Sequence, residues 1–197
     1  MPTGVALRDA RQQLYDAAER ILLRDGPSAL SSRAVTTEAG VAKGVLHRHF
    51  ADFDAFVAEF VLDRAERTSA EMASLRDTAG AGDIAANLTN ALTALFASVA
   101  VAVIPLIAFR DEVRNRLRDT WPVGVPVLTE AAELIAAYLA AERDLGRIAP
   151  RADPDTLAAT LVGTAHLLYA DRGSPAPRTE DLARTVAAIL EPAAPKR

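Results

Sequence analysis

The sequence predicts an all-α protein, and three observations support that prediction. Apolar residues recur at intervals of three and four along almost the whole chain, and no segment shows the apolar–polar alternation of a half-buried strand. Glycine or proline separates the periodic segments, as is typical of connections between helices. The 197 residues are 50% hydrophobic, so the chain can bury a core rather than remain disordered.

The first predicted helix spans about residues 9–24. Its apolar side chains form one stripe because they recur at helical intervals, and they are Leu14, Ala17, Ala18, Ile21 and Leu22. Asp25-Gly26-Pro27 follows directly. Glycine accepts the left-handed conformation of a helix end and proline cannot continue the helix, so we expect the helix to stop there.

Residues 31–50 predict two short helices separated by a glycine turn. Ser31 can cap the first helix, and the second spans about residues 42–49. The positions expected to hold this unit together are Val35, Ala39, Gly40, Leu46 and Phe50. This is the spacing of a helix-turn-helix, whose second helix enters the major groove of DNA.

The outward face of the second short helix suits contact with DNA. It combines small residues for close approach with donors for base edges and phosphates, namely Lys43, Gly44, Val45, His47 and Arg48. Residues 1–50 hold seven basic and five acidic side chains, whereas residues 51–197 have a net charge of −6. A basic head on an acidic body is typical of a protein whose head alone contacts a polyanion.

The rest of the chain predicts six further helices. Asp52 can cap a long fourth helix that becomes polar after Asp63. The remaining five are expected, between glycine and proline breaks that include Pro105, near residues 83–103, 106–119, 126–144, 154–171 and 179–190. The predicted domains are a DNA-binding domain over residues 1–52 and a helical effector-binding and dimerisation domain over residues 53–197.

Residues 84–109 carry no charge and are long enough to span a bilayer. The run is rich in alanine, contains polar residues and is interrupted by Pro105, so buried helices are favoured over a membrane span. The amino terminus lacks the features of a secretory signal. We therefore expect a cytoplasmic protein with no membrane partner, and a membrane-associated helical protein remains an alternative.

Enzymatic functions find little support in the sequence. It has no cysteine and only three histidines, and His47 and His49 are two residues apart, which points them to different sides of a helix. Phosphate-binding glycine loops and hydrolase or metalloprotease motifs are missing. The arginines of residues 110–119 alternate with acids and indicate a solvated helix face. We expect no enzyme, no metal and no cofactor.

The first fifty or so residues closely resemble the DNA-binding domain of the TetR family of bacterial transcriptional regulators. The resemblance covers residues 24–26, Ala29-Leu30 and residues 31–50, and its strongest parts are the run Ala39-Gly40-Val41-Ala42-Lys43-Gly44 and the ending Leu46-His47-Arg48-His49-Phe50. It implies base contacts from Arg33, Lys43, Gly44 and Val45, and phosphate contacts from Ser32, Thr37, His47, Arg48 and His49. Arg8 and Arg11 could add contacts to the DNA backbone.

Three positions depart from the family's pattern. Ala42 stands where the family usually has a capping serine or threonine, His47 where it has tyrosine, and Phe53 where it has a phosphate-binding lysine. The resemblance implies a homodimeric regulator, a repressor that reads a palindromic operator in double-stranded DNA and leaves it when a small apolar effector binds. The alternative is a helical ligand-binding protein that has lost specific DNA binding, as Ala42 and Phe53 would allow.

The resemblance also implies an effector pocket among the fourth to eighth helices and a dimer interface on the last two. Candidate pocket residues are Phe60, Asn87, Asn90, Phe96, Phe109, Trp121, Tyr138, His166 and Tyr169. Each of them could instead be ordinary core packing. Candidate interface residues are Leu157, Leu161, Ala165, Leu168, Leu182, Val186, Ile189 and Leu190, for which the alternative is the core within one chain.

Overall fold

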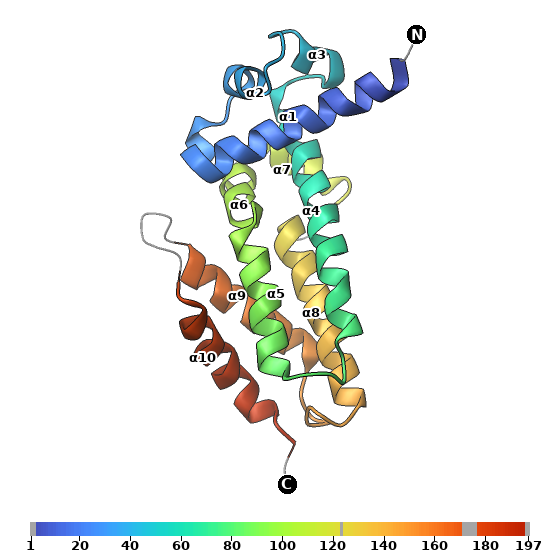
Figure 1. Ribbon diagram of the computed structural model, residues 1–197, viewed down its shortest axis with the longest axis vertical. Coiled ribbons are helices and arrows are strands. Elements are labelled where there is room, and N and C mark those ends of the chain that lie inside the picture. Colours follow the sequence, from blue (N-terminus) through green and yellow to red (C-terminus); the bar gives the residue numbers. More distant parts are fainter. Residues whose placement is uncertain (1–2, 123, 171–176, 196–197) are drawn as a thin grey trace. The chain divides into compact units, whose positions relative to one another are not determined.

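The described part of the chain is helical throughout (Figure 1). The structure, a computed structural model, describes residues 3–122, 124–170 and 177–195, and their side chains except at residues 3–9, 100 and 101. Its ten α-helices are α1 (Thr3–Asp25), α2 (Ser32–Glu38), α3 (Val45–His49), α4 (Phe53–Asp77), α5 (Ile84–Ala97), α6 (Ala100–Ala108), α7 (Asp111–Arg118), α8 (Pro126–Asp144), α9 (Pro154–Tyr169) and α10 (Thr179–Leu190). Two short 3₁₀ segments follow α1 and α10.

Several predicted helix limits agree with the structure because capping residues set them. The Ser31 hydroxyl accepts from the Ala34 amide, and the Asp52 carboxylate accepts from the Ala55 amide at 2.8 Å. The prediction for α10 is also confirmed at both ends. Residue 171, where the eighth predicted helix was expected to end, lies outside the described residues.

The expected break at Pro105 is wrong. The chain breaks instead at Ser98, whose backbone is extended, and α6 continues through Pro105. Pro105 only removes the one backbone donor that another residue would supply at that position, so the helix can continue. At Ser98 the side-chain hydroxyl donates to the Leu95 carbonyl, and the helix ends there. A second break at Phe109 and Arg110 separates α6 from α7, so the described residues form ten helices rather than the expected nine.

The chain divides into two compact units. The first unit comprises residues 1–64 and 102–125, and the second comprises residues 65–101 and 126–197. Residues 53–64 and 102–125 thus pack with the first three helices, although the predicted domain boundary falls after residue 52. Packing and functional boundaries are different properties, and the functional boundary stays a prediction.

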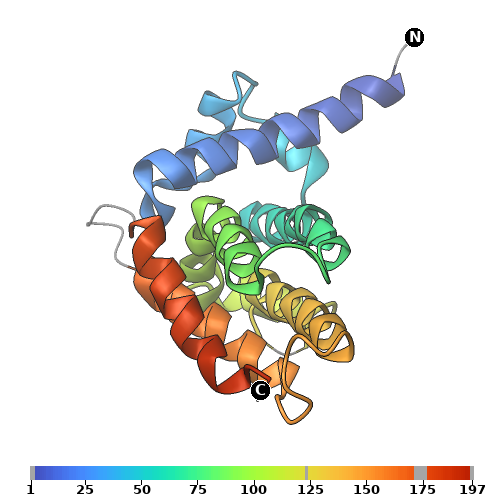
Figure 2. The same cartoon turned by 60° about the horizontal axis from the view of Figure 1, so that its bottom comes forward.

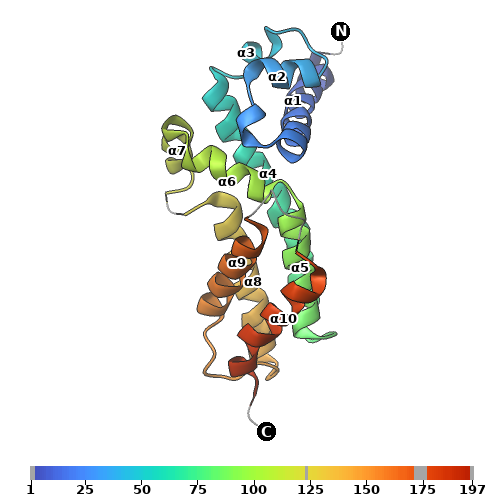
Figure 3. The ribbon, with the colours of Figure 1, turned by 90° about the vertical axis from the view of Figure 1, so that its left-hand side faces the viewer.

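The core of the first unit combines α1, α3 and the start of α4. Leu14, Leu22, Leu46 and Phe56 have no exposed surface. The Tyr15 ring lies 5.8–5.9 Å, centroid to centroid, from the three rings of Phe50, Phe56 and Phe60. Figure 1 shows α1 running alongside α2 and α3, and Figure 3 shows α1 next to α2. Leu14, Ala17 and Leu22 of the apolar stripe of α1 have no exposed surface.

A buried arginine joins α1 to α4 within the first unit. The Arg64 side chain is 3% exposed, and its guanidinium lies 3.3 Å from the Asp16 carboxylate and 3.2 Å from that of Glu19. It also lies over the Phe60 ring, 5.2 Å from the centroid. A buried charge must be paired, so these contacts fix the packing of the two helices.

The second unit is a helical bundle in which α9 packs against α8, α10 and α5 (Figure 2). Its core contains Leu88, Leu92, Ile135, Leu139 and Leu161, each at most 1% exposed. The aromatic ring of Phe96 on α5 stacks on that of Tyr169 on α9 at 5.2 Å. This ring contact joins the end of α5 to the end of α9.

A buried polar cluster holds the connection between α4 and α5. The Glu142 side chain is fully buried; its carboxylate accepts from the Gly80 amide at 3.2 Å and lies 3.2 Å from the Arg147 guanidinium. The Arg147 guanidinium donates to the Gly82 carbonyl. The Asn87 amide donates at 3.0 Å to the Tyr138 hydroxyl, and burial raises the pKa of Tyr138 to about 12. We call Glu142, Arg147, Asn87 and Tyr138 the loop clamp.

No single helix of the described chain is long and apolar enough to cross a membrane. Across the break at residues 98–101, Ile84–Ala97 and Ala102–Ala108 pass that test together, on length and composition only.

Candidate nucleic-acid interface

Helices α2 and α3 form the expected helix-turn-helix. Gly40 follows α2 with a φ of +67°, a left-handed conformation that glycine adopts without strain. The Gly40 amide donates to the Thr37 carbonyl at 3.1 Å and the Val41 amide to the Thr36 carbonyl at 3.0 Å. These bonds close the end of α2 and turn the chain toward α3.

The two faces of this unit are separated by burial. Val35 and Leu46 have no exposed surface and Phe50 is 3% exposed, so they anchor the two helices on α1. Of the other predicted positions of this core, Ala39 is half-buried and Gly40 is exposed. The inward residues fix the orientation of α3, and its outward residues stay accessible.

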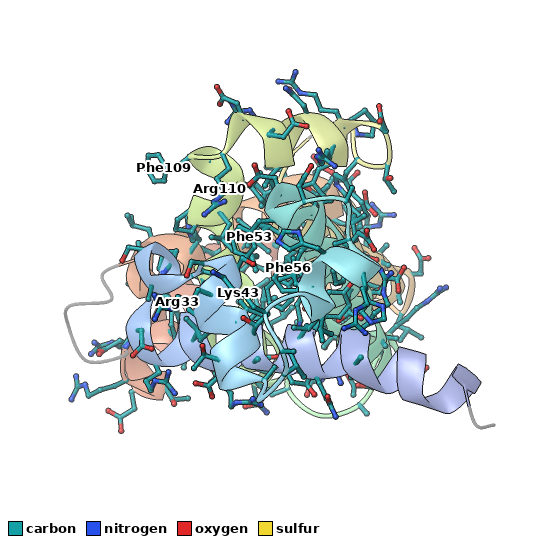
Figure 4. The ribbon with its side chains drawn as sticks, turned by 90° about the horizontal axis from the view of Figure 1, so that it is seen from above. Arg33, Lys43, Phe53, Phe56, Phe109 and Arg110 are labelled. Carbon is teal, nitrogen blue, oxygen red and sulfur yellow. The ribbon has the colours of Figure 1, made fainter. Side chains whose placement is uncertain are left out.

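The predicted DNA-contacting residues lie on the accessible side of the unit. Six are exposed and three are half-buried; the exposed ones are Arg33, Thr37, Lys43, Gly44, His47 and Arg48, and the half-buried ones are Ser32, Val45 and His49. Figure 4 shows Arg33 and Lys43 on the face of this unit that is turned toward the viewer. One surface thus collects donors from α2, the turn and α3.

The basic side chains of the first unit fall into two groups. Among the described residues, no acidic side chain pairs with Arg33, Lys43 or Arg48, so their charge is available to an anion. Arg20 and Arg24 differ because both bind Glu38, at 2.9 and 3.1 Å. Phosphate binding needs free charge, so the first group fits it and the second does not.

Arg11, expected to contact the DNA backbone, has other partners in the structure. Its guanidinium pairs with Glu59, lies 4.5 Å from the centroid of the Phe50 ring and donates to the His49 carbonyl at 3.4 Å. It therefore holds the end of α3 against α1 and α4. The side chain of Arg8 lies outside the described side chains.

Helix α3 begins at Val45, three residues later than expected. Ala42 has no side-chain oxygen to cap a helix, and the Val45 amide instead donates to the Ala42 carbonyl at 2.8 Å in a turn. Gly44 occupies the cap position without a side-chain hydrogen bond. Lys43 and Gly44 therefore lie in the turn before α3 rather than in the helix.

A cluster that the sequence analysis missed joins α7 to the start of α4. The Arg110 guanidinium lies 2.8 Å from the Asp54 carboxylate and 5.2 Å from the centroid of the Phe53 ring. The Arg116 guanidinium lies 2.8 Å from the Asp52 carboxylate and 3.0 Å from that of Glu112. The expected Glu112–Arg116 pair is confirmed. The contacts to residues 52–54 join positions 56 and 64 residues apart, so the sequence around Arg110 and Arg116 does not indicate them.

The second candidate site is a groove between α4 and α5 in the second unit. Its volume is about 260 Å³, and its lining residues are Thr68, Glu71, Met72, Ser74, Leu75, Thr78, Asn87, Asn90, Ala91, Ala94, Leu95 and Ser98. Seven of these twelve residues are polar and five are apolar. Asn87 joins the groove to the loop clamp through its bond to Tyr138.

Of the nine predicted pocket residues, only Asn87 and Asn90 line this groove. Phe60 and Tyr138 are fully buried in the cores of the two units, and Phe96 stacks on Tyr169 and His166. Phe109, which is 87% exposed, and Trp121 belong to the first unit. Aromatic and polar residues at helical spacing serve these different roles, and the sequence alone could not separate them.

Half of the predicted dimer-interface residues lie in the core of the second unit. Leu161, Ala165, Leu182 and Val186 are each 1% exposed in the single chain, where they pack in its core. Leu157, Ile189 and Leu190 are half-buried and Leu168 is exposed. The accessible face of α9 contains Ala159, Thr160, Gly163 and Leu167 instead.

The helix-turn-helix and its unpaired basic face give the amino-terminal region the features of a DNA-binding domain. Residues 14–60 match the sequence model of the bacterial regulatory proteins of the tetR family. No curated protein sequence matches the chain. The match to the family model covers the helix-turn-helix and the start of α4, so residues 14–60 are similar to the amino-terminal domain of this family.

Several solved structures are similar to this chain over nearly its whole length. Escherichia coli NemR in its reduced form has a TM-score of 0.75 at 15% identity, covering 96% of this chain and 100% of that one. A TetR transcription regulator from Haloarcula marismortui has a TM-score of 0.71 at 16% identity, with 95% and 99% covered. The multidrug binding protein EbrR, complexed with imidazole, has a TM-score of 0.59 at 23% identity, with 91% and 94% covered. These similarities show the fold.

Proposed function

We propose that this regulator is a homodimeric repressor that reads a palindromic operator and leaves it when a small molecule binds. The observation that carries the proposal is the unpaired basic surface of Arg33, Lys43 and Arg48, held in a fixed orientation by the buried Leu46 and Phe50. A two-fold dimer would place two such surfaces about 34 Å apart, one turn of DNA. Lys43, Gly44 and Arg33 would then read bases, and Thr37, His47 and Arg48 would bind phosphates.

The experiment that tests DNA binding is selection of duplexes from a random pool, followed by affinity measurements across salt concentrations. A palindrome whose affinity falls steeply with salt supports the proposal. Lys43→Ala and Arg48→Ala should each weaken binding, whereas Arg118→Ala should not, although Arg118 is an equally exposed arginine. No enrichment at low salt would favour the alternative, a ligand-binding protein that has lost specific DNA binding.

The α4–α5 groove is the proposed effector site. Met72, Leu75 and Leu95 supply apolar surface for the small apolar effector expected from the sequence, and Asn87 and Asn90 supply hydrogen bonds that orient it. A screen would follow release of a fluorescent operator by small apolar compounds. Ala94→Trp should abolish the response by filling the groove, whereas Ala97→Trp should retain it, because Ala97 is exposed on α5 outside the groove.

The accessible face of α9, with Leu167 near its end, is the proposed dimer interface together with the exposed side of α10. Ala159, Thr160 and Gly163 would allow close approach of a second helix, and Leu167 is 75% exposed in the single chain. A two-fold axis through this face would bring the same residues of two chains together.

A further inference from the structure

The α7 cluster consists of Arg110 and Arg116 together with Asp52, Phe53 and Asp54, and the last three follow α3 closely in the sequence. Phe50 is the last residue of the α3 turn, with its amide bonded to the Leu46 carbonyl at 3.0 Å, and Asp52 follows two residues later. The direction in which the chain leaves α3 is therefore set by how Asp52 and Phe53 are held.

Asp52 has two separate partners, one for each carboxylate oxygen. Oδ1 accepts from the Ala55 amide at 2.8 Å and caps α4, while Oδ2 binds the Arg116 guanidinium at 2.8 Å. Both contacts favour the charged carboxylate, and the pKa of Asp52 lies below its usual range chiefly because of the Ala55 amide. The cap that starts α4 is thus bonded to α7.

Phe53 provides a second route from α7 to the recognition helix. Arg110 lies over the Phe53 ring, the Phe53 ring stacks on Phe56 at 5.7 Å, and Phe56 meets Phe50 edge-on at 5.1 Å. Figure 4 shows Arg110, Phe53 and Phe56 in this order. A continuous set of ring contacts therefore links Arg110 to the residue that ends α3.

The α6–α7 corner is itself held by side-chain bonds. Arg114 donates to the carbonyls of Ile107 and Ala108, at 3.4 and 3.0 Å, and pairs with Asp111. These bonds satisfy carbonyls at the end of α6 and fasten α7 to it. A displacement of α6 would therefore carry α7 and its two arginines with it.

We propose that Arg110 and Arg116 are positioning residues for DNA recognition. They set the orientation of α3 by holding residues 52–54, and they do not contact DNA. This deepens the proposed function, on which it rests, by naming the side chains that hold the DNA-binding surface in place.

The test compares Arg110→Gln, Arg116→Gln and the double variant with Arg118→Gln in the full chain. Arg118 is a matched control because it is exposed on α7 and pairs with no acid among the described residues. The double variant should bind the selected operator about tenfold more weakly, from the sum of two partly exposed ion pairs and a cation–π contact. Arg118→Gln should stay within about twofold of the wild type.

Salt dependence separates positioning from contact. Loss of a phosphate contact lowers the slope of log affinity against log salt by about 1, so a positioning role predicts an unchanged slope in both single variants. Arg110→Lys and Arg116→Lys should restore affinity because they keep the ion pairs. A lowered slope, or unchanged affinity in the double variant, would overturn the proposal.

Amide hydrogen exchange tests the same connection without DNA, so it also decides the proposal if the wild-type protein selects no operator. The peptide covering residues 45–50 should exchange faster in the double variant than in Arg118→Gln, while peptides from α9 remain unchanged. Equal exchange of residues 45–50 in the two proteins would overturn the proposal, whatever the outcome with DNA.

Discussion

Removing one partner of the Glu142–Arg147 ion pair should cost far more than removing the other. The Glu142 side chain has no exposed surface, whereas that of Arg147 is 30% exposed. Arg147→Met keeps the hydrocarbon stem but leaves a buried carboxylate without its cation, which costs about 3–5 kcal/mol. Glu142→Gln keeps the shape and the acceptor for the Gly80 amide, and the arginine can reach water, so the expected cost is about 1 kcal/mol.

The double variant distinguishes this explanation from a general loss of packing. Adding Glu142→Gln to Arg147→Met removes the uncompensated charge and should recover about 2 kcal/mol, although it makes a second change in the same cluster. In a chain of this size 1 kcal/mol corresponds to about 2–4 °C, so Arg147→Met should melt roughly 10 °C lower and the double variant should regain about half of that.

The assay is thermal and urea unfolding followed by circular dichroism, at one protein concentration and at pH 7.5. A loss in Glu142→Gln as large as that in Arg147→Met, or a double variant less stable than Arg147→Met, would refute the reasoning.

Three further outcomes are expected. Leu46→Ala should lower the free energy of unfolding by about 3 kcal/mol because it leaves a cavity at a fully buried position, while Lys43→Ala stays within about 0.5 kcal/mol, as thermal melts would show. Leu167→Glu should convert the proposed dimer into a monomer in light scattering, and Leu23→Glu, at a 52% exposed position on α1, should not. Tyr138 has a pKa of about 12, so the stability that it contributes is complete below about pH 10 and is lost between pH 10 and 12; Tyr138→Phe should remove that loss from alkaline unfolding curves.

Local chemistry made the amino-terminal region predictable from sequence. The side chains of Ser31 and Asp52 contain the oxygens that cap α2 and α4, and Gly40 indicates the turn between α2 and α3. The alternation of Leu46 with His47 and Arg48 predicts which side faces inward, because one helix turn fixes it. The type of an element and the face on which a residue lies depend on neighbours within four positions. Those neighbours can be seen directly in the sequence.

The features that sequence could not reveal depend on partners far along the chain. The sequence indicated that Arg110 and Arg116 belong to a solvated helix face. Their partners Asp54 and Asp52 are 56 and 64 residues away, so the pattern of neighbouring residues could not indicate these contacts. Leu161 has the periodicity of both an intrachain core and a dimer seam, and only three-dimensional packing decides between them. Pro105 indicated a break by its chemistry, yet the loss of one backbone bond was tolerated.

The division of the helix-turn-helix into buried and exposed positions bears on how such a protein can change over evolution. Lys43, His47 and Arg48 contribute no packing to the core, so substitutions there change stability by only about 0.5 kcal/mol. Leu46 and Phe50 carry the stability and read no bases. The operator preference of this protein can therefore drift, or be re-engineered by saturating a few surface codons, without a compensating repair of the fold.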